Sequence, residues 1–299
     1  MCIRDSLVTL QSGNYLRRII RALSSVKLNA DGTQAYEVYH SILNTKDLGV
    51  PQNRPRWYCV GLRKDINTKS TFEFPRRLPC PSIELFLDAD SSQSTQGTTS
   101  SLSKTAKTNI ANATAKILRD GGKPALKSYI VDCDASISKS RYTFDYSPCL
   151  TRSRYNGHWI TNKERRMNKS EVCRLQGFNP SDVVVDIPES ALGQQLGNAM
   201  SVNVIEQVIR NVLEVLGYKQ GEIPATNRWA DGTAIQQIKT KEVTLKRQGE
   251  PLPDFRIIQR IAAAKGISHA GKRRDTIVDS GATYHLVDEA DLSLSLIHI

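Results

Sequence analysis

The chain has 299 residues, of which 39% are hydrophobic and 24% are charged, a composition compatible with a folded core. Its formal net charge of +11 favours a polyanionic partner, nucleic acid first, although a soluble protein that happens to be basic explains the charge about as well. No apolar run approaches membrane-spanning length, so a membrane partner is not expected. The six cysteines are scattered without metal-ligand spacing, which favours a reducing compartment and no metal site.

The two ends of the chain are set apart from the expected fold. Residues 1–6 (MCIRDS) and 292–299 (LSLSLIHI) resemble translated sequencing-adapter sequence. We therefore expect the chain to be a fragment of a longer reading frame.

The first elements along the chain are predicted to form the last part of an α/β sheet. Residues 15–26 carry apolar side chains at helical spacing and predict a helix. Residues 36–43 and 56–62 are rich in β-branched and aromatic side chains and predict two strands, separated by the turn-prone residues 44–55. A helix followed by a strand, a loop and a second strand is typical of the end of such a sheet.

The middle of the chain begins with a change in composition. Residues 88–108 are mostly Ser and Thr and predict a flexible linker. Residues 109–119 are rich in Ala and predict a helix, which Gly121 and Gly122 end. Residues 128–133 predict a short strand.

Two helices are predicted farther along. Residues 168–177 have Asn168 and Glu171 at capping-box spacing, and a glycine where a C-terminal cap belongs. Residues 203–216 carry one continuous apolar stripe and predict the clearest helix of the chain. Residues 219–253 have a weaker pattern and predict a linker.

The sharpest chemical signal lies at residues 47–63, DLGVPQNRPRWYCVGLR. Gln52, Arg54 and Arg56 alternate, and alternate residues of an extended segment point the same way. Two guanidiniums and an amide could therefore project into one cleft, where guanidiniums suit phosphate oxygens and the acceptor edges of bases. A basic surface hairpin explains the same residues with about equal weight.

This stretch resembles the eighth motif of the DNA cytosine-5 methyltransferases, Gln-x-Arg-x-Arg at the mouth of a strand. The resemblance implies that Arg56 contacts the edge of a flipped cytosine. It also implies that Arg54 supports the catalytic loop and that Gln52 buttresses the hinge beside it.

Two further segments resemble the ninth and tenth motifs of the family. Residues 147–180 carry the ninth-motif residues in order, namely Arg166, Glu171, Arg174, Leu175, Gln176, Gly177 and Phe178. From spacing alone, Glu171 and Arg174 could simply pair on one helix. Residues 192–204 (LGQQLGNAMSVNV) resemble the tenth motif, which implies that Gly197, Asn198 and Ala199 line the pocket of the cofactor S-adenosyl-L-methionine.

The resemblance covers roughly residues 15–218 and implies an α/β fold. We expect a partial, Rossmann-like sheet of the S-adenosylmethionine-dependent methyltransferases, with strand 56–62 antiparallel to its neighbours, a small target-recognition insert and a largely irregular C-terminal tail. It implies double-stranded DNA as the partner, and a nuclear location in a eukaryote or a cytoplasmic one otherwise.

The expected organisation divides the chain into seven parts. These are residues 1–6 and 292–299, both adapter-like; 7–74, the end of the catalytic domain; 75–146, the target-recognition insert; 147–218, the return to the catalytic domain; 219–262, a linker; and 263–291, a protease-like segment.

The chain departs from the family in its chemistry. The family's nucleophilic thiol in Pro-Cys-Gln, its Glu-Asn-Val motif and its Gly-containing cofactor loop do not occur in this sequence. Cys80 and Cys149 follow a Pro but lie after the eighth motif, and we expect both to be structural. We therefore expect no methyl transfer by this chain alone, and a non-catalytic DNA-binding remnant is the alternative.

A second resemblance lies at residues 275–287, DTIVDSGATYHLV. Asp279 and the four residues after it resemble the active-site turn of retroelement aspartic proteases, in which such an Asp activates water. This implies that the parent is the polyprotein of a mobile element. We expect no protease activity from this segment, because it contains only the active-site turn.

Overall fold

A long antiparallel hairpin forms the backbone of the fold in the computed structural model, which describes residues 8, 10–28, 32–66, 68–89, 102–185, 187–218, 226–239, 246–247 and 294–297. Strand β1 (Tyr36–Asn44) pairs with β2 (Pro55–Arg63) along its whole length. Both predicted strands are confirmed to within one residue, because β-branched and aromatic side chains favour a pleated, extended backbone.

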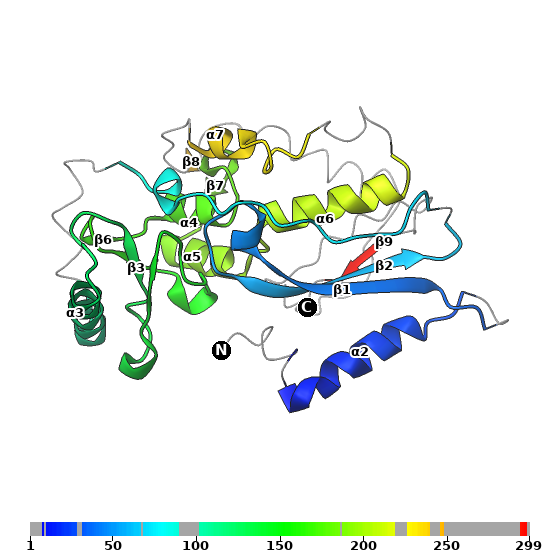
Figure 1. The fold of residues 1–299 in the computed structure, drawn as a ribbon, viewed down its shortest axis with the longest axis horizontal. Helices are drawn as coiled ribbons and strands as arrows, with labels where there is room; N and C mark the ends of the chain where they lie inside the picture. The colour runs from blue at the N-terminus through cyan, green and yellow to red at the C-terminus, as the bar shows by residue number, and fades with distance from the viewer. Residues whose placement is uncertain are drawn as a thin grey trace, which may run out of the picture.

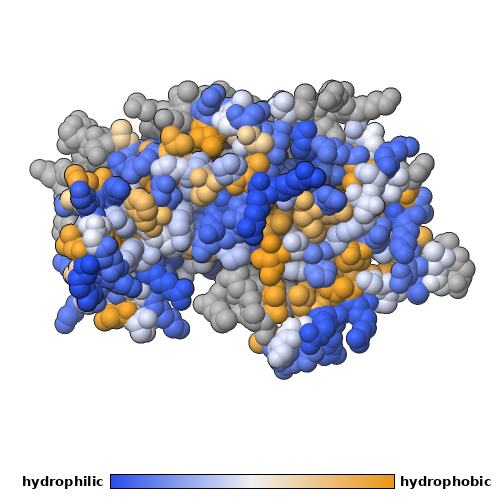
Figure 2. Space-filling model, viewed as in Figure 1, coloured by the Kyte–Doolittle hydropathy of each residue, from blue (hydrophilic) through white to orange (hydrophobic). Residues whose placement is uncertain are grey.

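Helices lie on opposite sides of this hairpin (Figure 1). On one side α6 (Val202–Val215) packs its apolar stripe, including Val208 and Val212, against Val60 of β2. On the other side α2 (Asn14–Ser24) lies against β1, and none of its residues is buried. Figure 2 shows apolar side chains along the hairpin above α2. Ile42 of β1 is 54% exposed.

The second edge of β2 pairs with β9 (Leu294–Ile297), again antiparallel. The predicted antiparallel direction of β2 is thus confirmed on both sides. The structure differs here from the expectation that residues 292–299 take no part in the fold. An open edge offers a row of unpaired N–H and C=O groups, and a short apolar segment can satisfy them.

A second, smaller sheet has the strand order β4-β3-β5-β6. Its strands are β3 (Tyr129–Val131), β4 (Tyr142–Phe144), β5 (Trp159–Ile160) and β6 (Arg165–Arg166). The sheet joins strands from both sides of the predicted domain boundary at residues 146–147, so residues on the two sides of that boundary share one structural unit.

Helix α3 (Lys104–Arg119) covers this sheet and begins earlier than predicted. Ser103 is the N-cap, and its hydroxyl accepts a hydrogen bond from the Ala106 amide at 3.1 Å. A cap of this kind satisfies one of the unpaired amides of the first turn. The linker prediction is therefore wrong for residues 102–108.

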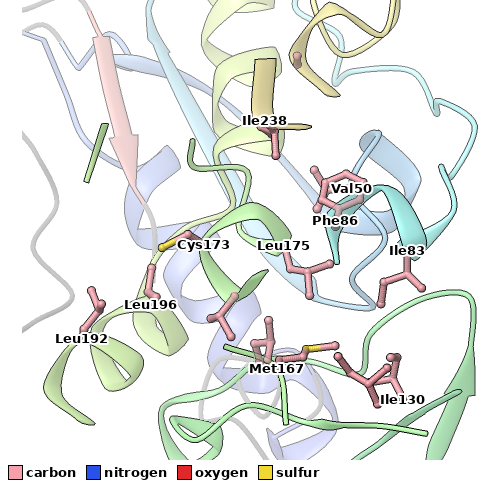
Figure 3. Packing of buried hydrophobic residues seen from close by; sticks show 14 of the residues in the cluster. Val50, Ile83, Phe86, Ile130, Met167, Cys173, Leu175, Leu192, Leu196 and Ile238 are labelled. Atoms are coloured by element: carbon pink, nitrogen blue, oxygen red, sulfur yellow. The ribbon is translucent and has the colours of Figure 1, made fainter. Parts of the chain in front are cut away.

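The largest apolar cluster joins three short helices, α4 (Lys169–Leu175), α5 (Glu189–Asn198) and α7 (Thr233–Lys239). Figure 3 shows Val50, from the loop before β2, beside Phe86 and near Ile238 of α7. Trp229, just before α7, is only 3% exposed. The linker prediction is wrong for residues 226–239, because their few apolar side chains complete this distant core.

The remaining elements are short. They are the 3-10 helices at Leu10–Gly13, Thr45–Leu48, Ile83–Phe86, Ile137–Lys139, Arg152–Arg154 and Pro180–Asp182, and the parallel pair β7 (Val184–Val185) and β8 (Lys246–Arg247).

The predicted capping box of α4 is confirmed. The Asn168 side chain accepts from the Glu171 amide at 2.8 Å, and the Glu171 carboxylate accepts from the Asn168 amide at 2.8 Å. The pairing of Glu171 with Arg174 is wrong. Glu171 instead forms a two-pronged ion pair with Arg165, and Arg174 reaches Asp88 at 2.6 Å.

None of the helices in the described ranges is both long and apolar enough to cross a membrane. The protease-like Asp279, with residues 263–291 as a whole, lies outside the described residues and stays a prediction.

Candidate functional site

Backbone contacts join the loop before β2 to the segment that follows β4. Gln52 and Ser147 form a parallel bridge. The Asn53 amide donates to the Ser147 carbonyl, and the Ser147 amide donates to the Pro51 carbonyl, both at 2.8 Å. Two motif segments about a hundred residues apart are thereby joined into one wall.

Gln52 is fully buried inside this wall. Its side-chain amide donates to the Leu175 carbonyl at 2.6 Å, and its side-chain oxygen accepts from the Leu150 amide at 3.0 Å. Gln52 therefore ties the end of α4 to the start of the ninth-motif segment, and it is not among the residues that line the adjacent cleft.

Arg54 is 2% exposed and joins three stretches of backbone. Its guanidinium donates to the carbonyl oxygens of Leu150 at 2.5 Å, Gly197 at 3.0 Å and Ala199 at 2.8 Å. Burial lowers the pKa of Arg54 from its usual value, and the neighbouring Cys149 thiol opposes this effect. Arg54 thus brings the eighth-, ninth- and tenth-motif segments together.

Arg56 lies one step farther along β2 and turns toward Cys149. Its guanidinium donates to the Pro55 carbonyl at 2.6 Å and approaches the Cys149 sulfur at 3.2 Å. The same sulfur lies 3.6 Å from Arg54. The structure thus brings the three alternating residues predicted from sequence onto one side of the strand, facing residues 149–150.

Arg54 and Arg56 lie at the base of a cleft of about 1110 Å³. Its other wall comes from the small sheet and the segments around it. The charged residues among those lining it are the cations Arg54, Arg56, Lys139, Arg141, Arg152 and Arg154, with Asp132 as the acid. A concave surface with this excess of cations concentrates a polyanion.

The three predicted cofactor residues lie at the end of α5. A side chain at Gly197 would collide with the backbone of Thr151 and Arg152, so this glycine serves a close approach within the chain. The Ala199 carbonyl is occupied by Arg54, while Asn198 lines the cleft. Gly197 lines the same cleft, and the assignment of these residues to S-adenosyl-L-methionine stays a prediction.

The other arginines that line this cleft, Arg152 and Arg154, were not predicted from the sequence. Arg152 and Arg154 alternate in the run TRSR, as Arg54 and Arg56 do, and this alternation was an available signal. Arg152 is held by Gln194 at 3.3 Å and Arg154 by Asp132 at 2.5 Å.

His158 lies directly behind this wall and is 1% exposed. Its Nδ1 is 3.8 Å from a carboxylate oxygen of Asp132. Burial lowers the pKa of His158 below its usual value of 6.5, and the charge of Asp132 opposes that shift only in part. The imidazole is therefore held neutral at physiological pH.

Comparison with known proteins agrees with the three motifs. Residues 5–214 match the C-5 cytosine-specific DNA methylase family. The type II methyltransferase M.HaeII of Haemophilus aegyptius is 30% identical over 210 residues, which are 70% of this chain and 58% of that protein. M.NgoBI of Neisseria gonorrhoeae is 31% identical over 203 residues, 67% of this chain and 56% of that protein. The chain thus spans a little over half the length of these relatives.

Two solved structures that match part of the chain are methyltransferases. EhMeth of Entamoeba histolytica has 18% identity and a TM-score of 0.41, over 69% of this chain and 59% of that one. The Dnmt2 methyltransferase of S. pombe has 17% identity and a TM-score of 0.39, over 71% of this chain and 66% of that one. Because the family match covers well over half of its residues, the chain belongs to the C-5 cytosine-specific DNA methylase family.

Proposed function

We propose that the chain is the DNA-binding and base-positioning part of a DNA cytosine-5 methyltransferase. In the whole protein a methyl group passes from S-adenosyl-L-methionine to C5 of a cytosine that is flipped out of duplex DNA. The observation that carries the proposal is the basic cleft with Arg54 and Arg56 at its base, in a chain of this family.

The two arginines have different roles in this proposal. The Arg54 guanidinium donates to the backbone carbonyls of Leu150, Gly197 and Ala199, so Arg54 is a positioning residue that fixes the cleft. Arg56, which is 3% exposed, lines the same cleft and contacts the Cys149 sulfur, and it is the residue assigned to the base edge. Gln52 supports both from behind, through Leu150 and Leu175.

Duplex DNA suits the cleft because of its charge density. Each protein cation that neutralises a phosphate releases a bound counterion, so the affinity falls steeply as salt rises. Lys139, Arg141, Arg152 and Arg154 line the wall opposite Arg56 and are the groups assigned to phosphate and base contact.

Binding of the full 299-residue chain to a duplex of about 20 base pairs tests this proposal, with fluorescence anisotropy measured at several salt concentrations. We expect the logarithm of the binding constant to fall linearly with the logarithm of the salt concentration, with a slope of roughly −0.9 for each phosphate neutralised. Absence of binding at low salt would contradict the proposal.

A transfer assay with radiolabelled S-adenosyl-L-methionine and cytosine-containing duplex tests the catalytic part. We expect no incorporation by this chain alone, because the Pro-Cys-Gln and Glu-Asn-Val motifs are not in its sequence. Incorporation would show that another thiol serves as the nucleophile. Sequencing the source DNA upstream of the codon for Leu7 then separates an enzyme, which needs both motifs in frame there, from a non-catalytic DNA-binding remnant.

A further inference from the structure

Asp132 lies between a cation of the cleft and a buried imidazole. Its carboxylate oxygen Oδ1 accepts a hydrogen bond from Nε of Arg154 at 2.5 Å, and the same oxygen is 3.8 Å from Nδ1 of His158. A hydrogen bond to the imidazole needs a separation of about 2.7–3.2 Å, so this oxygen is bonded to Arg154 and not to His158. Asp132 and Arg154 line the cleft, whereas His158 is 1% exposed and lies behind them.

The charged groups that act on His158 are Asp132, Arg154 and Asp134. Asp134 is already committed, because both of its carboxylate oxygens accept hydrogen bonds from the guanidinium of Arg166. Backbone of the neighbouring segment also lies against the imidazole, and Nε2 is buried with no hydrogen-bond partner among the residues that the structure describes. Asp132 is therefore the acid on which a positively charged His158 depends.

A phosphate bound to Arg154 would release the carboxylate of Asp132. The Arg154 side chain is 21% exposed and lines the cleft, so a phosphate of a bound duplex can reach it. A guanidinium suits phosphate oxygens, and a phosphate paired with Arg154 supplies the negative charge that Asp132 supplies without it. A movement of about 1 Å then brings Oδ1 of Asp132 within hydrogen-bond distance of His158. A carboxylate at that distance favours the charged form of the imidazole.

We propose that Asp132 and His158 are positioning residues for Arg154, and that they couple the binding of a duplex phosphate to the uptake of one proton by His158. The inference rests on the proposed DNA-binding function. Before DNA binds, burial lowers the pKa of His158 from 6.5 and the imidazole is neutral. When a phosphate pairs with Arg154, Asp132 turns to His158, and the imidazole takes a proton from the solvent. Because linkage is reciprocal, DNA raises the pKa of His158, and a falling pH strengthens DNA binding.

Isothermal titration calorimetry of the full chain with a duplex of about 20 base pairs tests the proposal. Titrations at pH 6.0 in two buffers that differ in ionisation enthalpy give the number of protons taken up for each duplex bound. We expect up to about one proton for the unsubstituted chain, and a value lower by about half a proton or more for His158→Gln. His40→Gln, which removes an exposed imidazole of β1 outside the cleft, is the matched control and should keep the uptake of the unsubstituted chain.

Two further variants keep His158 and interrupt the coupling elsewhere. Asp132→Asn removes the carboxylate but nearly keeps its size, so we expect the duplex to bind at low salt while the proton uptake is lost. Arg154→Gln removes the phosphate partner, so the uptake should be lost and the magnitude of the salt slope should fall by about one. Arg119→Gln, an equal charge change on the exposed end of α3 outside the cleft, should keep the uptake. Circular dichroism at pH 6.0 verifies that each variant is folded, and these two variants serve if His158→Gln is not.

Three outcomes would overturn the inference. If His158→Gln or Asp132→Asn takes up as many protons as the unsubstituted chain, these two residues do not couple the proton to the duplex. If the unsubstituted chain binds duplex DNA without proton uptake, the coupling does not exist, although the DNA-binding function stands. If the unsubstituted chain binds no duplex at all, the proposed function fails together with this inference.

Discussion

Arg54 holds the site together through backbone carbonyls. Its three carbonyl partners belong to Leu150, Gly197 and Ala199, which come from two segments that the sequence separates widely from β2. Each carbonyl is buried or partly buried and needs a donor. A guanidinium can serve all three because its donors are spread around a rigid plane, which an ammonium cannot match.

The substitution Arg54→Met keeps most of the volume and removes every donor. We expect the free energy of unfolding to fall by about 3 kcal/mol or more, because each buried acceptor left without a partner costs about 1–3 kcal/mol. Urea denaturation followed by circular dichroism measures this change. Arg18→Met, at an exposed position of α2, is the matched control and should change the value by no more than about 0.5 kcal/mol. Equal losses in the two variants would show that Arg54 is not a structural tie.

At the scale of elements, the segment before α7 closes the core around the site. The Trp229 side chain lies against Gly49 and Gly177, where a Cβ atom would come within 3.5 Å and 3.4 Å of it. Its ring nitrogen donates to Glu206 of α6 at 3.0 Å. Gly49 begins the loop that carries the site, and Gly177 ends α4, so Trp229 packs between the two. Trp229 itself lies beyond residue 214, where the family match ends.

We expect Trp229→Ala to lower the free energy of unfolding by about 3–5 kcal/mol, since a large buried side chain is lost and a cavity remains. Trp229→Phe keeps a ring but loses the bond to Glu206, so its loss should be smaller. Leu126→Ala is the control, because Leu126 is 74% exposed. Urea titration followed by circular dichroism compares the three, and a Trp229→Ala value as small as that of the control would exclude a core role for this segment.

These elements also show which parts of the structure the sequence can predict. Strands β1 and β2 were predictable from their β-branched and aromatic side chains, and helix α6 from its apolar stripe, because each of these signals is local. Strands β5 and β6 have two residues each, too few to show alternation, and they form only through pairing with β3 and each other. Helix α7 was not predicted for a similar reason. Its few apolar residues become core residues only when distant segments pack around them.

The same distinction applies to the site. Gln52, Arg54 and Arg56 were predictable because their alternation is local and lies in an extended segment. Lys139 and Arg141 were not, because they reach the cleft only when the small sheet folds against β2. Gly197 approaches the backbone of Thr151 closely, and nothing in the local sequence indicates this contact.

At the scale of the whole molecule, charge limits the conditions under which the fold is stable. The chain already carries a formal net charge of +11, and its cleft collects six cations around one acid. A positive charge on the side chain behind Asp132 would lie near Arg154. Asp132 could not fully compensate that charge, because its carboxylate already pairs with Arg154. The buried His158 is the group that would acquire such a charge as the pH falls.

The pH dependence of stability follows from the lowered pKa of His158. Burial is the largest cause of that shift, Asp132 and Asp134 oppose it, and Arg154 adds to it. In the unfolded chain the imidazole titrates near its usual value of about 6.5. As the pH falls below that value, the unfolded state takes up a proton that the folded state does not. The contribution to stability is therefore fully present above about 6.5 and is lost as the pH falls through the folded pKa.

Urea unfolding at pH 7.5 and pH 5.5 measures this loss, and His158→Gln removes the titrating group. We expect the free energy of unfolding of the unsubstituted chain to fall more between the two pH values than that of His158→Gln, because the amide takes up no proton in either state. His40→Gln, at an exposed position of β1, controls for the loss of an imidazole as such and should keep the pH dependence of the unsubstituted chain. Equal pH dependence in the unsubstituted chain and in His158→Gln would mean that His158 takes up its proton as readily in the folded state as in the unfolded one. Burial behind the cleft wall would then not hold it neutral.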